Sequence, residues 1–217
     1  MSSTLQARTG RHLQRYENHF RLVAGCIPYR LKQNVENPTG DLLSKLEVLM
    51  ISSPKCHDLV FPKGGWENDE AMDEAASREA LEEAGVRGII HGTQRIVHSF
   101  LQDTLLGVWE FRSKSKQNLC GQEGACRGYM FALEVTEELA IWPEQSTHDR
   151  KWLNAWEAWK LCRYDWMREA LNSLSVLITG KPVRLLAVPE ISDSASLFFL
   201  VKPSGTECVD SAINAIC

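Results

Sequence analysis

Short apolar runs in the first third of the chain predict strands, and a longer amphipathic stretch after them predicts a helix. The runs over residues 20–29, 45–52 and 59–61 end in turn signals such as Ser53-Pro54, which is typical of strands. The stretch that follows Gly65 has a helical pattern and ends at Gly85, a residue suited to the left-handed conformation after a helix.

The second half of the chain shows the same mixture. Residues 88–95, 104–112 and 128–135 predict three more strands, and the polar residues 113–127 predict a loop between the last two. Residues 154–178 predict one long helix, because large apolar residues recur there at helical spacing before Gly180. Strands on both sides of one central helix, with a second helix near the end, predict an α/β/α sandwich in which a mixed sheet lies between helices.

Length and composition indicate one globular domain with short extensions. The chain has 217 residues, of which 44% are hydrophobic and 24% charged. We expect a polar N-terminal arm over residues 1–18, the domain over 19–180, and a C-terminal tail over 181–217. The longest apolar runs, such as 197–201, are far shorter than the roughly 20 residues that span a membrane, so we expect no membrane partner.

The net charge and the cysteine content indicate which binding partners and which cellular compartment to expect. The net charge is −4, so we expect no nucleic-acid partner, and any polyanion must bind to a local cluster of Arg and Lys. The seven cysteines contain no CxxC pair and favour a reducing compartment, the cytoplasm or the nucleus. Arg8, Arg11 and Arg15 in an acid-poor N-terminus leave the mitochondrion open as an alternative.

The helix that ends at Gly85 is strongly acidic. Residues 67–83 hold eight acids and one base, and like charges four residues apart destabilise a helix by about 0.2–0.5 kcal/mol. Glu79, Glu82 and Glu83 fall at i, i+3 and i+4 and so project from one side. They form either a solvated acidic face or a site for Mg²⁺, with Mn²⁺ as the other candidate ion, and spacing alone leaves both open.

The residues around these acids decide between the two interpretations. Gly64 is followed after five residues by Glu70, and after seven more by Arg78-Glu79-Ala80-Leu81-Glu82-Glu83-Ala84-Gly85-Val86. This pattern resembles the Nudix box, G-x5-E-x7-R-E-U-x-E-E-x-G-U, where U is a bulky aliphatic residue and only the first U, Ala80, is weak. The resemblance implies a Nudix sandwich and a Mg²⁺-dependent hydrolase of diphosphates linked to a further group.

The resemblance also implies roles for the box residues. Glu79 and Glu83 would be metal ligands, and Glu82 would be the base that activates water. Glu70 would be a further metal-side or structural acid, and Arg78 would orient the carboxylates. Which of the three helix glutamates is the base differs among Nudix enzymes, so that assignment stays open.

Sequence outside the box suggests the substrate. Residues 61–67 (FPKGGWE) resemble the entry to the box in diphosphoinositol polyphosphate phosphohydrolases, and further similarity over residues 21–30, 48–53, 129–137 and 150–152 is greatest to the plant branch. This implies an enzyme that releases the β-phosphate of inositol pyrophosphates, and we expect it to act as a monomer. Hydrolysis of diadenosine or other dinucleoside polyphosphates is the alternative, and a non-catalytic phosphate-binding module is a third.

A highly phosphorylated ring requires several cations around one pocket. The candidate substrate-binding residues are Arg21, Arg30, Ser52, Ser53, Lys63, Gly64, Gly65, Arg127 and Arg150. The arginines and the lysine have surface charge as their alternative role. Ser52 and Ser53 have a turn before Pro54 as theirs.

Overall fold

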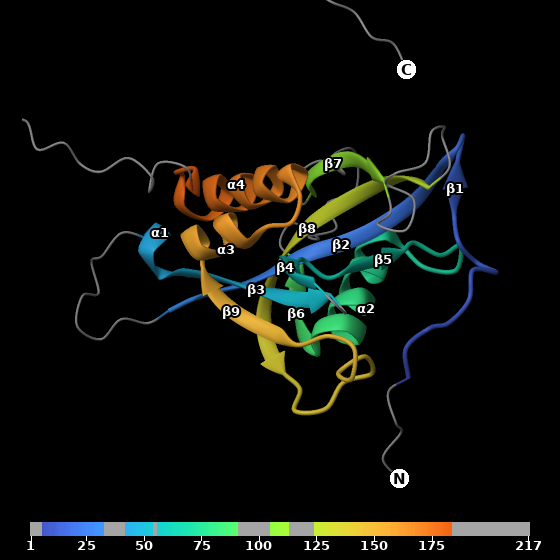
Figure 1. Cartoon of the computed structure of the whole chain (residues 1–217), viewed down its shortest axis with the longest axis horizontal. Helices are drawn as coiled ribbons and strands as arrows, with labels where there is room; N and C mark the ends of the chain where they lie inside the picture. The colour runs from blue at the N-terminus through green and yellow to red at the C-terminus, as the bar shows by residue number, and fades with distance from the viewer. Residues whose placement is uncertain (1–5, 33–41, 54–55, 91–104, 113–123, 184–217) are drawn as a thin grey trace, which may run out of the picture.

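The computed structural model describes residues 6–32, 42–53, 56–90, 105–112 and 124–183. Within these residues one mixed sheet lies between helices, with α2 on one side and α3 and α4 on the other (Figure 1). The strands are β1 Tyr16–Glu17, β2 Phe20–Leu31, β3 Leu46–Ser53, β4 Cys56–Val60, β5 Lys63–Gly65, β6 Val86–Ile90, β7 Leu105–Arg112, β8 Ala125–Glu138 and β9 Arg150–Asn154. The helices are α1 Leu42–Lys45, α2 Met72–Ala84, α3 Ala155–Leu161 and α4 Asp165–Thr179. The expected α/β/α architecture is confirmed.

Two long strands form the middle of the sheet. The main path of the sheet runs β4-β3-β2-β8-β6, and β2 and β8 pair in parallel over nine residues from Arg21↔Cys126 to Tyr29↔Glu134. The other strand pairs are antiparallel, and β5 pairs with the first half of β2. This pairing places the start of the box, Lys63–Gly65, directly on the central strand.

The acidic helix α2 packs closely on β2 because its inner face is made of alanines. Ala75, Ala76 and Ala80 are fully buried, and the Cys26 thiol of β2 lies 3.8 Å from the Ala76 carbonyl oxygen. Small side chains let the helix backbone approach the sheet. The carboxylates on the adjoining face of α2 are therefore held against β5 rather than projecting into solvent.

The long helix expected over residues 154–178 was wrong. The chain instead forms β9, then α3, and then α4 after a break over residues 162–164. Cys162 pairs with Leu59 of the edge strand β4, and the Arg163 amide donates to the Leu59 carbonyl oxygen at 3.2 Å. An unpaired strand edge offers backbone partners that a continuous helix at this point would leave unused. Tertiary pairing therefore overrides the helical pattern.

Two further boundaries differ from the sequence interpretation. Residues 125–127, expected in a loop, belong to β8, because they pair with β2 and β7. The strand expected over 88–95 is seen as β6, and residues 91–95 lie outside the described part, as does the tail from residue 184 onward.

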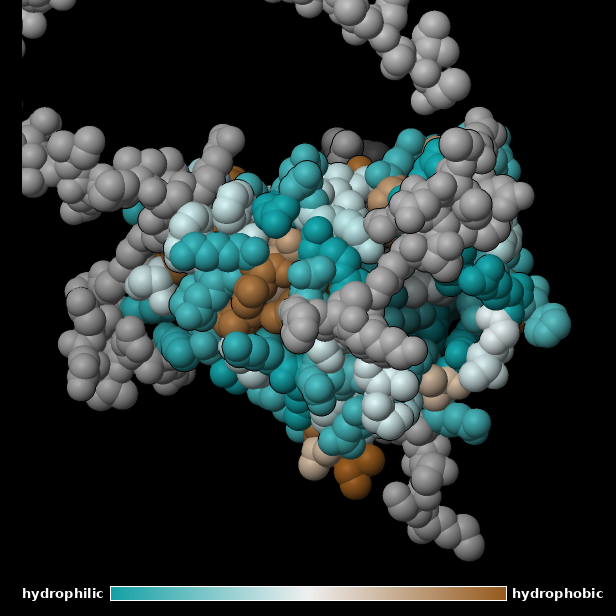
Figure 2. Space-filling model, in the orientation of Figure 1, coloured by the Kyte–Doolittle hydropathy of each residue, from teal (hydrophilic) through white to brown (hydrophobic). Residues whose placement is uncertain are grey.

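The described part of the N-terminal arm lies against the box. The Arg15 amide donates to the Trp66 carbonyl oxygen at 2.9 Å, and the Asn68 amide donates to the Leu13 carbonyl oxygen at 2.7 Å. The surface seen in Figure 2 is mainly hydrophilic, with a compact hydrophobic area beside α3 and a smaller one at the lower edge. Among the described residues, none of the helices is both long and apolar enough to cross a membrane.

Candidate active site

Arg78 is the centre of the acidic cluster. Its guanidinium donates two hydrogen bonds to Glu70, at 2.9 and 2.8 Å, one to Glu79 at 2.7 Å and one to Glu82 at 3.2 Å. A further bond reaches the Gly65 carbonyl oxygen at 2.9 Å. Burial opposes the charge on Arg78, but the bonds to Glu70 and the nearby carboxylates outweigh it and raise its pKa. Arg78 thus orients three carboxylates at once.

Glu70 acts as the anchor of this arginine. One carboxylate oxygen accepts from Arg78 and from the Glu67 amide at 3.1 Å, and the other accepts from Arg78 and lies 4.0 Å from the Arg8 guanidinium. Burial favours the neutral acid, but these donors outweigh it and lower the pKa of Glu70. Of the two roles that the box resemblance left open for Glu70, the contacts favour the structural one over metal binding.

Glu79 and Glu83 lie one turn apart on the face of α2 that meets β5. Burial raises the pKa of Glu79 to about 8, and the charge of Glu83 adds to this effect. Burial also raises the pKa of Glu83. Two features of Lys63 oppose this shift, namely the charge of its ammonium and the hydrogen bond that its backbone amide donates to Glu83 at 2.8 Å. A Cβ on Gly64 would lie 2.2 Å from the Glu79 carboxylate, so this close approach requires glycine.

The donor set fits a divalent cation. Glu79 and Glu82 are 8% and 6% exposed, and burial raises the pKa of Glu82 as well. The four acids Glu70, Glu79, Glu82 and Glu83 outnumber the two bases beside them, Arg78 and Lys63, so their full ionisation would leave excess negative charge. A hard dication would relieve this excess negative charge, and carboxylate oxygens are the ligands that Mg²⁺ and Mn²⁺ prefer.

A further base reaches the cluster from the N-terminal arm. The Arg8 guanidinium donates to Glu67 at 2.6 Å and to Asp69 at 2.9 Å, and its amide donates to Glu82 at 3.2 Å. The arm therefore supplies positive charge and one hydrogen bond to the acidic face of the box.

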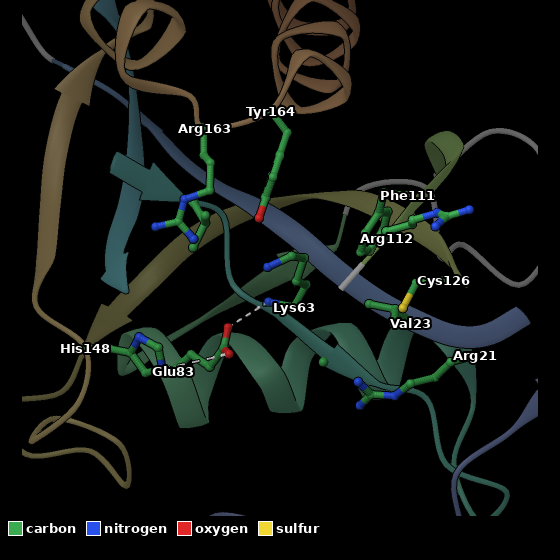
Figure 3. Close-up of a pocket in the computed structure, with 12 residues that line it drawn as sticks. Arg21, Val23, Lys63, Glu83, Phe111, Arg112, Cys126, His148, Arg163 and Tyr164 are labelled. Carbon is green, nitrogen blue, oxygen red and sulfur yellow. Dashed lines mark hydrogen bonds and ion pairs between the residues drawn. The ribbon is translucent and has the colours of Figure 1, made fainter. Parts of the chain in front are cut away.

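A pocket of about 230 Å³ opens beside Glu83, between β2, β5 and the segment before α4. Figure 3 shows Arg163 and Tyr164 pointing into it from that segment, opposite Lys63 and Glu83. The basic residues that line it are Arg21, Lys63, Arg112, His148 and Arg163. Phe111 and Tyr164 give it an aromatic wall. The pocket thus combines positive charge with one edge of the metal-binding helix.

Three of the expected substrate-binding residues line this pocket, namely Arg21, Lys63 and Gly64. The Arg21 guanidinium is held by Gln14 at 2.7 Å. Desolvation lowers the pKa of the Lys63 ammonium, and the charges of Glu83 and Glu79 oppose that shift. Gly65 does not line the pocket, and its carbonyl oxygen accepts from Arg78.

Arg127 lies away from the pocket. Its neighbour Cys126 lines the pocket, and successive residues of a strand point to opposite faces of the sheet. Arg127 forms ion pairs with Glu17 and Glu110 and lies over the ring of Phe20 at 4.5 Å. The geometry does not bring it to the substrate-binding face.

Arg150 and Arg30 are engaged elsewhere as well. The Arg150 guanidinium donates to the carbonyl oxygens of Ala84, Gly85 and Leu139 at 2.8–3.1 Å, so it caps the C-terminal end of α2. Arg30 pairs with Glu47 at 2.9 Å and stacks over a tryptophan of β9. Neither residue lines the pocket.

Ser52 has a positioning role in the structure. Its hydroxyl oxygen accepts from the Asp149 amide at 3.0 Å, and its carbonyl oxygen accepts from the His148 ring at 2.8 Å. The side chain of Ser53 lies outside the described part of the chain.

Sequence reasoning missed Phe111, Arg112, His148, Arg163 and Tyr164. They come from three separate segments and share no spacing that could have signalled a site. Three other aromatic residues near the box lie outside this pocket: Trp66 and Tyr129 meet edge to face beside the N-terminal arm, and Phe131 is buried in the core.

Comparison with known proteins identifies the family. Residues 35–174 match the model of the NUDIX domain. The chain belongs to the Nudix family. It is 62% identical over 174 residues to a protein named "Nudix hydrolase 13, mitochondrial" of Arabidopsis thaliana, covering 78% of this chain and 81% of the relative. It is 58% identical over 173 residues to "Nudix hydrolase 12, mitochondrial" of the same plant, covering 78% and 80%.

A solved Nudix structure shows the same fold. The NUDIX hydrolase from Nitrosomonas europaea superposes with a TM-score of 0.50 at 14% identity, covering 80% of this chain and 98% of that one. The family expected from the box is confirmed, and the relatives agree with the plant branch. As a Nudix hydrolase, the protein cleaves phosphoanhydride bonds in small-molecule substrates, a chemistry that relies on a divalent metal.

Proposed function

We propose that this Nudix hydrolase removes the β-phosphate of inositol pyrophosphates with Mg²⁺. The observation that carries the proposal is the group of basic side chains that surrounds the pocket beside Glu83. Arg21, Lys63 and Arg163 approach it from three different segments, so a compact ligand with phosphates on several sides would meet more than one cation.

Arg163 supports this assignment by its burial beside the pocket. Its side chain is 11% exposed and its Nε lies 3.6 Å from an Asp58 carboxylate oxygen. Its amide is tied to β4 through the Leu59 carbonyl oxygen. A partly buried guanidinium beside the pocket can donate to a phosphate with little competition from water.

The box residues would perform an in-line hydrolysis. Mg²⁺, when bound, neutralises phosphate charge and makes coordinated water more acidic. Glu79 and Glu83 would hold it, and Arg78 fixes their neighbour Glu82 by a bond of 3.2 Å. Glu82 accepts a proton from the water molecule while the oxygen of that water attacks the β-phosphorus. The bond to the bridging oxygen breaks, and orthophosphate and the inositol polyphosphate leave.

Dinucleoside polyphosphates are the second candidate substrates. Phe111 and Tyr164 line the pocket, and both rings stack with Trp166, at centroid distances of 4.8 and 6.3 Å. Such an aromatic wall would accept an adenine base. A binding module without activity is less favoured. Such a module would not need all three box carboxylates, and this chain has all three.

A one-tube competition tests the substrate. Equal concentrations of an inositol pyrophosphate and diadenosine hexaphosphate are incubated with Mg²⁺ and the full chain, and ³¹P NMR follows both, with Glu82→Gln as the blank. We expect the inositol β-phosphate signal to disappear first. Faster loss of the diadenosine compound would overturn the proposal and favour the second candidate, whereas no change in either would favour the binding module.

We further propose that the protein acts as a monomer in mitochondria. Five of the Arabidopsis relatives carry "mitochondrial" in their names, although another is named chloroplastic, and the N-terminal arm holds the arginines noted above. A fluorescent fusion at the C-terminus, followed by fractionation, checks the compartment. A signal confined to cytoplasm or nucleus would contradict it.

A further inference from the structure

The turn between β8 and β9 places a histidine and a carboxylate beside the box. The amides of Thr147 and His148 both donate to the Glu144 carbonyl oxygen at 3.0 Å, so the segment forms a helical turn. Residues four apart in such a turn lie on the same side. The Glu144 amide donates to the Glu82 carbonyl oxygen at 3.0 Å, which docks the turn on the end of α2.

Three potential ligand atoms meet there. His148 Nε2 lies 3.2 Å from Glu144 Oε2 and 4.0 Å from Glu83 Oε1, and all three atoms lie within 4.8 Å of one another. Two donors that bind one ion at about 2.1 Å each lie roughly 3–4 Å apart. Small side-chain adjustments would therefore bring the three atoms around a common centre.

The orientation of His148 is an independent observation that points to a ligand. Its Nδ1 donates to the Ser52 carbonyl oxygen at 2.8 Å, which turns Nε2 toward the two carboxylates. Ser52 is itself fixed, because its amide donates to the Asp149 carbonyl oxygen at 2.8 Å and its hydroxyl accepts from the Asp149 amide. A histidine that binds a metal almost always has its other ring nitrogen held in this way.

We propose that Glu144 and His148, together with Glu83 shared between two ions, bind a transition-metal dication, with Mn²⁺ as its probe, in addition to the ion held by the carboxylates of α2. A nitrogen donor is poorly suited to Mg²⁺, which prefers oxygen, and is accepted by Mn²⁺ and Zn²⁺. Glu83 and His148 also line the substrate pocket, so an ion there would face the bound phosphates. The competing interpretation is an ion pair between His148 and Glu144 that binds no metal.

Electron paramagnetic resonance of bound Mn²⁺ distinguishes the two. Mn²⁺ is titrated into the metal-free full chain without substrate, bound ions are counted, and electron spin-echo envelope modulation detects nitrogen ligands. We expect ¹⁴N modulation in the natural chain, its loss in His148→Gln, and one fewer tightly bound Mn²⁺ per chain in that variant. The matched control is His12→Gln, which removes an exposed histidine from the N-terminal arm and is expected to behave like the natural chain.

Glu144→Gln provides a second test of the same site. It keeps the shape of the side chain and removes the charge, so we expect at least tenfold weaker binding of the same Mn²⁺ ion with unchanged thermal unfolding in EDTA. Absence of ¹⁴N modulation in the natural chain, or equal Mn²⁺ binding in the natural chain and His148→Gln, would overturn the proposal. Since no substrate is present, the result does not depend on which phosphoanhydride the enzyme cleaves.

Discussion

A single guanidinium organises the acidic box. Arg78 bonds to Glu70, Glu79 and Glu82, so one side chain offsets the repulsion that the sequence places on α2. The guanidinium of Arg78 donates to both carboxylate oxygens of Glu70 at once. A lysine at this position would keep the positive charge but could not form this pair of hydrogen bonds.

We therefore expect Arg78→Lys to lower the free energy of unfolding by about 2–3 kcal/mol, since several carboxylates lose a buried partner. Urea denaturation in EDTA measures this change. Arg87→Lys is the control, because Arg87 and Glu137 form an exposed ion pair at 3.0 Å and the expected loss is below about 1 kcal/mol. Similar losses in both variants would contradict a special role for Arg78.

Glu82 carries the proposed proton transfer. We expect Glu82→Gln to keep metal and substrate binding and to lose at least ~100-fold in kcat, because an amide cannot accept the proton of the attacking water. Steady-state phosphate release, with calorimetry for Mg²⁺, measures both properties. Glu137→Gln removes an exposed carboxylate of β8 and serves as the control. A near-normal rate in Glu82→Gln would place the base elsewhere.

At the level of elements, the C-terminal end of helix α2 is held by a residue from strand β9. Gly85 adopts a left-handed conformation with φ of 64°, and Arg150 of β9 donates to the last carbonyl oxygens of the helix. A cation at this end is also favoured by the helix dipole. Arg150 thus determines where the end of the metal-binding helix lies.

Arg150→Ala should lower the free energy of unfolding by about 1–2 kcal/mol through the lost cap, while KM changes less than about twofold. Thermal unfolding and steady-state kinetics test the two parts together. Lys151→Ala, at the exposed neighbouring position, is the control and should change neither. A tenfold rise in KM at unchanged stability would instead return Arg150 to phosphate binding.

The N-terminal arm should also affect how tightly the box binds Mg²⁺. Arg8 lies 2.6 Å from Glu67 and 2.9 Å from Asp69, so it reduces the negative potential of the box. Arg8→Gln should raise Mg²⁺ affinity about two- to fivefold at low ionic strength, and added salt should shrink the difference because the contact is partly exposed. Isothermal calorimetry measures the affinities, with Arg11→Gln as control. Weaker Mg²⁺ binding in Arg8→Gln would contradict this account.

The whole molecule should respond to pH through its buried acids. The pKa of Glu79 is raised to about 8 by burial and by Glu83, and the pKa values of Glu83 and His148 are raised as well. The folded chain then binds more protons than the unfolded chain between about pH 4.5 and 8, so stability falls as pH rises through this range.

In EDTA, we expect the Tm to fall by several degrees between pH 6 and 8.5. Mg²⁺ competes with these protons, so its stabilising effect should increase over the same range. Differential scanning calorimetry with and without Mg²⁺ provides the measurement. A Tm in EDTA that rises with pH over this interval would show that the acids are not held in their protonated form.

The box was predictable because it is local. Gly64, Glu70, Arg78 and the three helix glutamates lie within 20 residues, and helical spacing alone brings Glu79, Glu82 and Glu83 to one side. The pocket was not predictable, because Arg163 is distant in sequence from Lys63. Arg163 reaches the pocket because its segment pairs with the edge of β4. Residues predicted as one helix could not show that pairing.

The sequence by itself determined the family, the acidic helix of the box and its end at Gly85, because these depend on the spacing of neighbouring residues. Tertiary structure alone decided which cations line the pocket. Arg127 follows Cys126 on β8 and points to the other face, and Arg150 is used to cap α2, while Arg163 and His148 enter the site from segments that showed no motif. Strand alternation and packing, which depend on distant partners, set these directions.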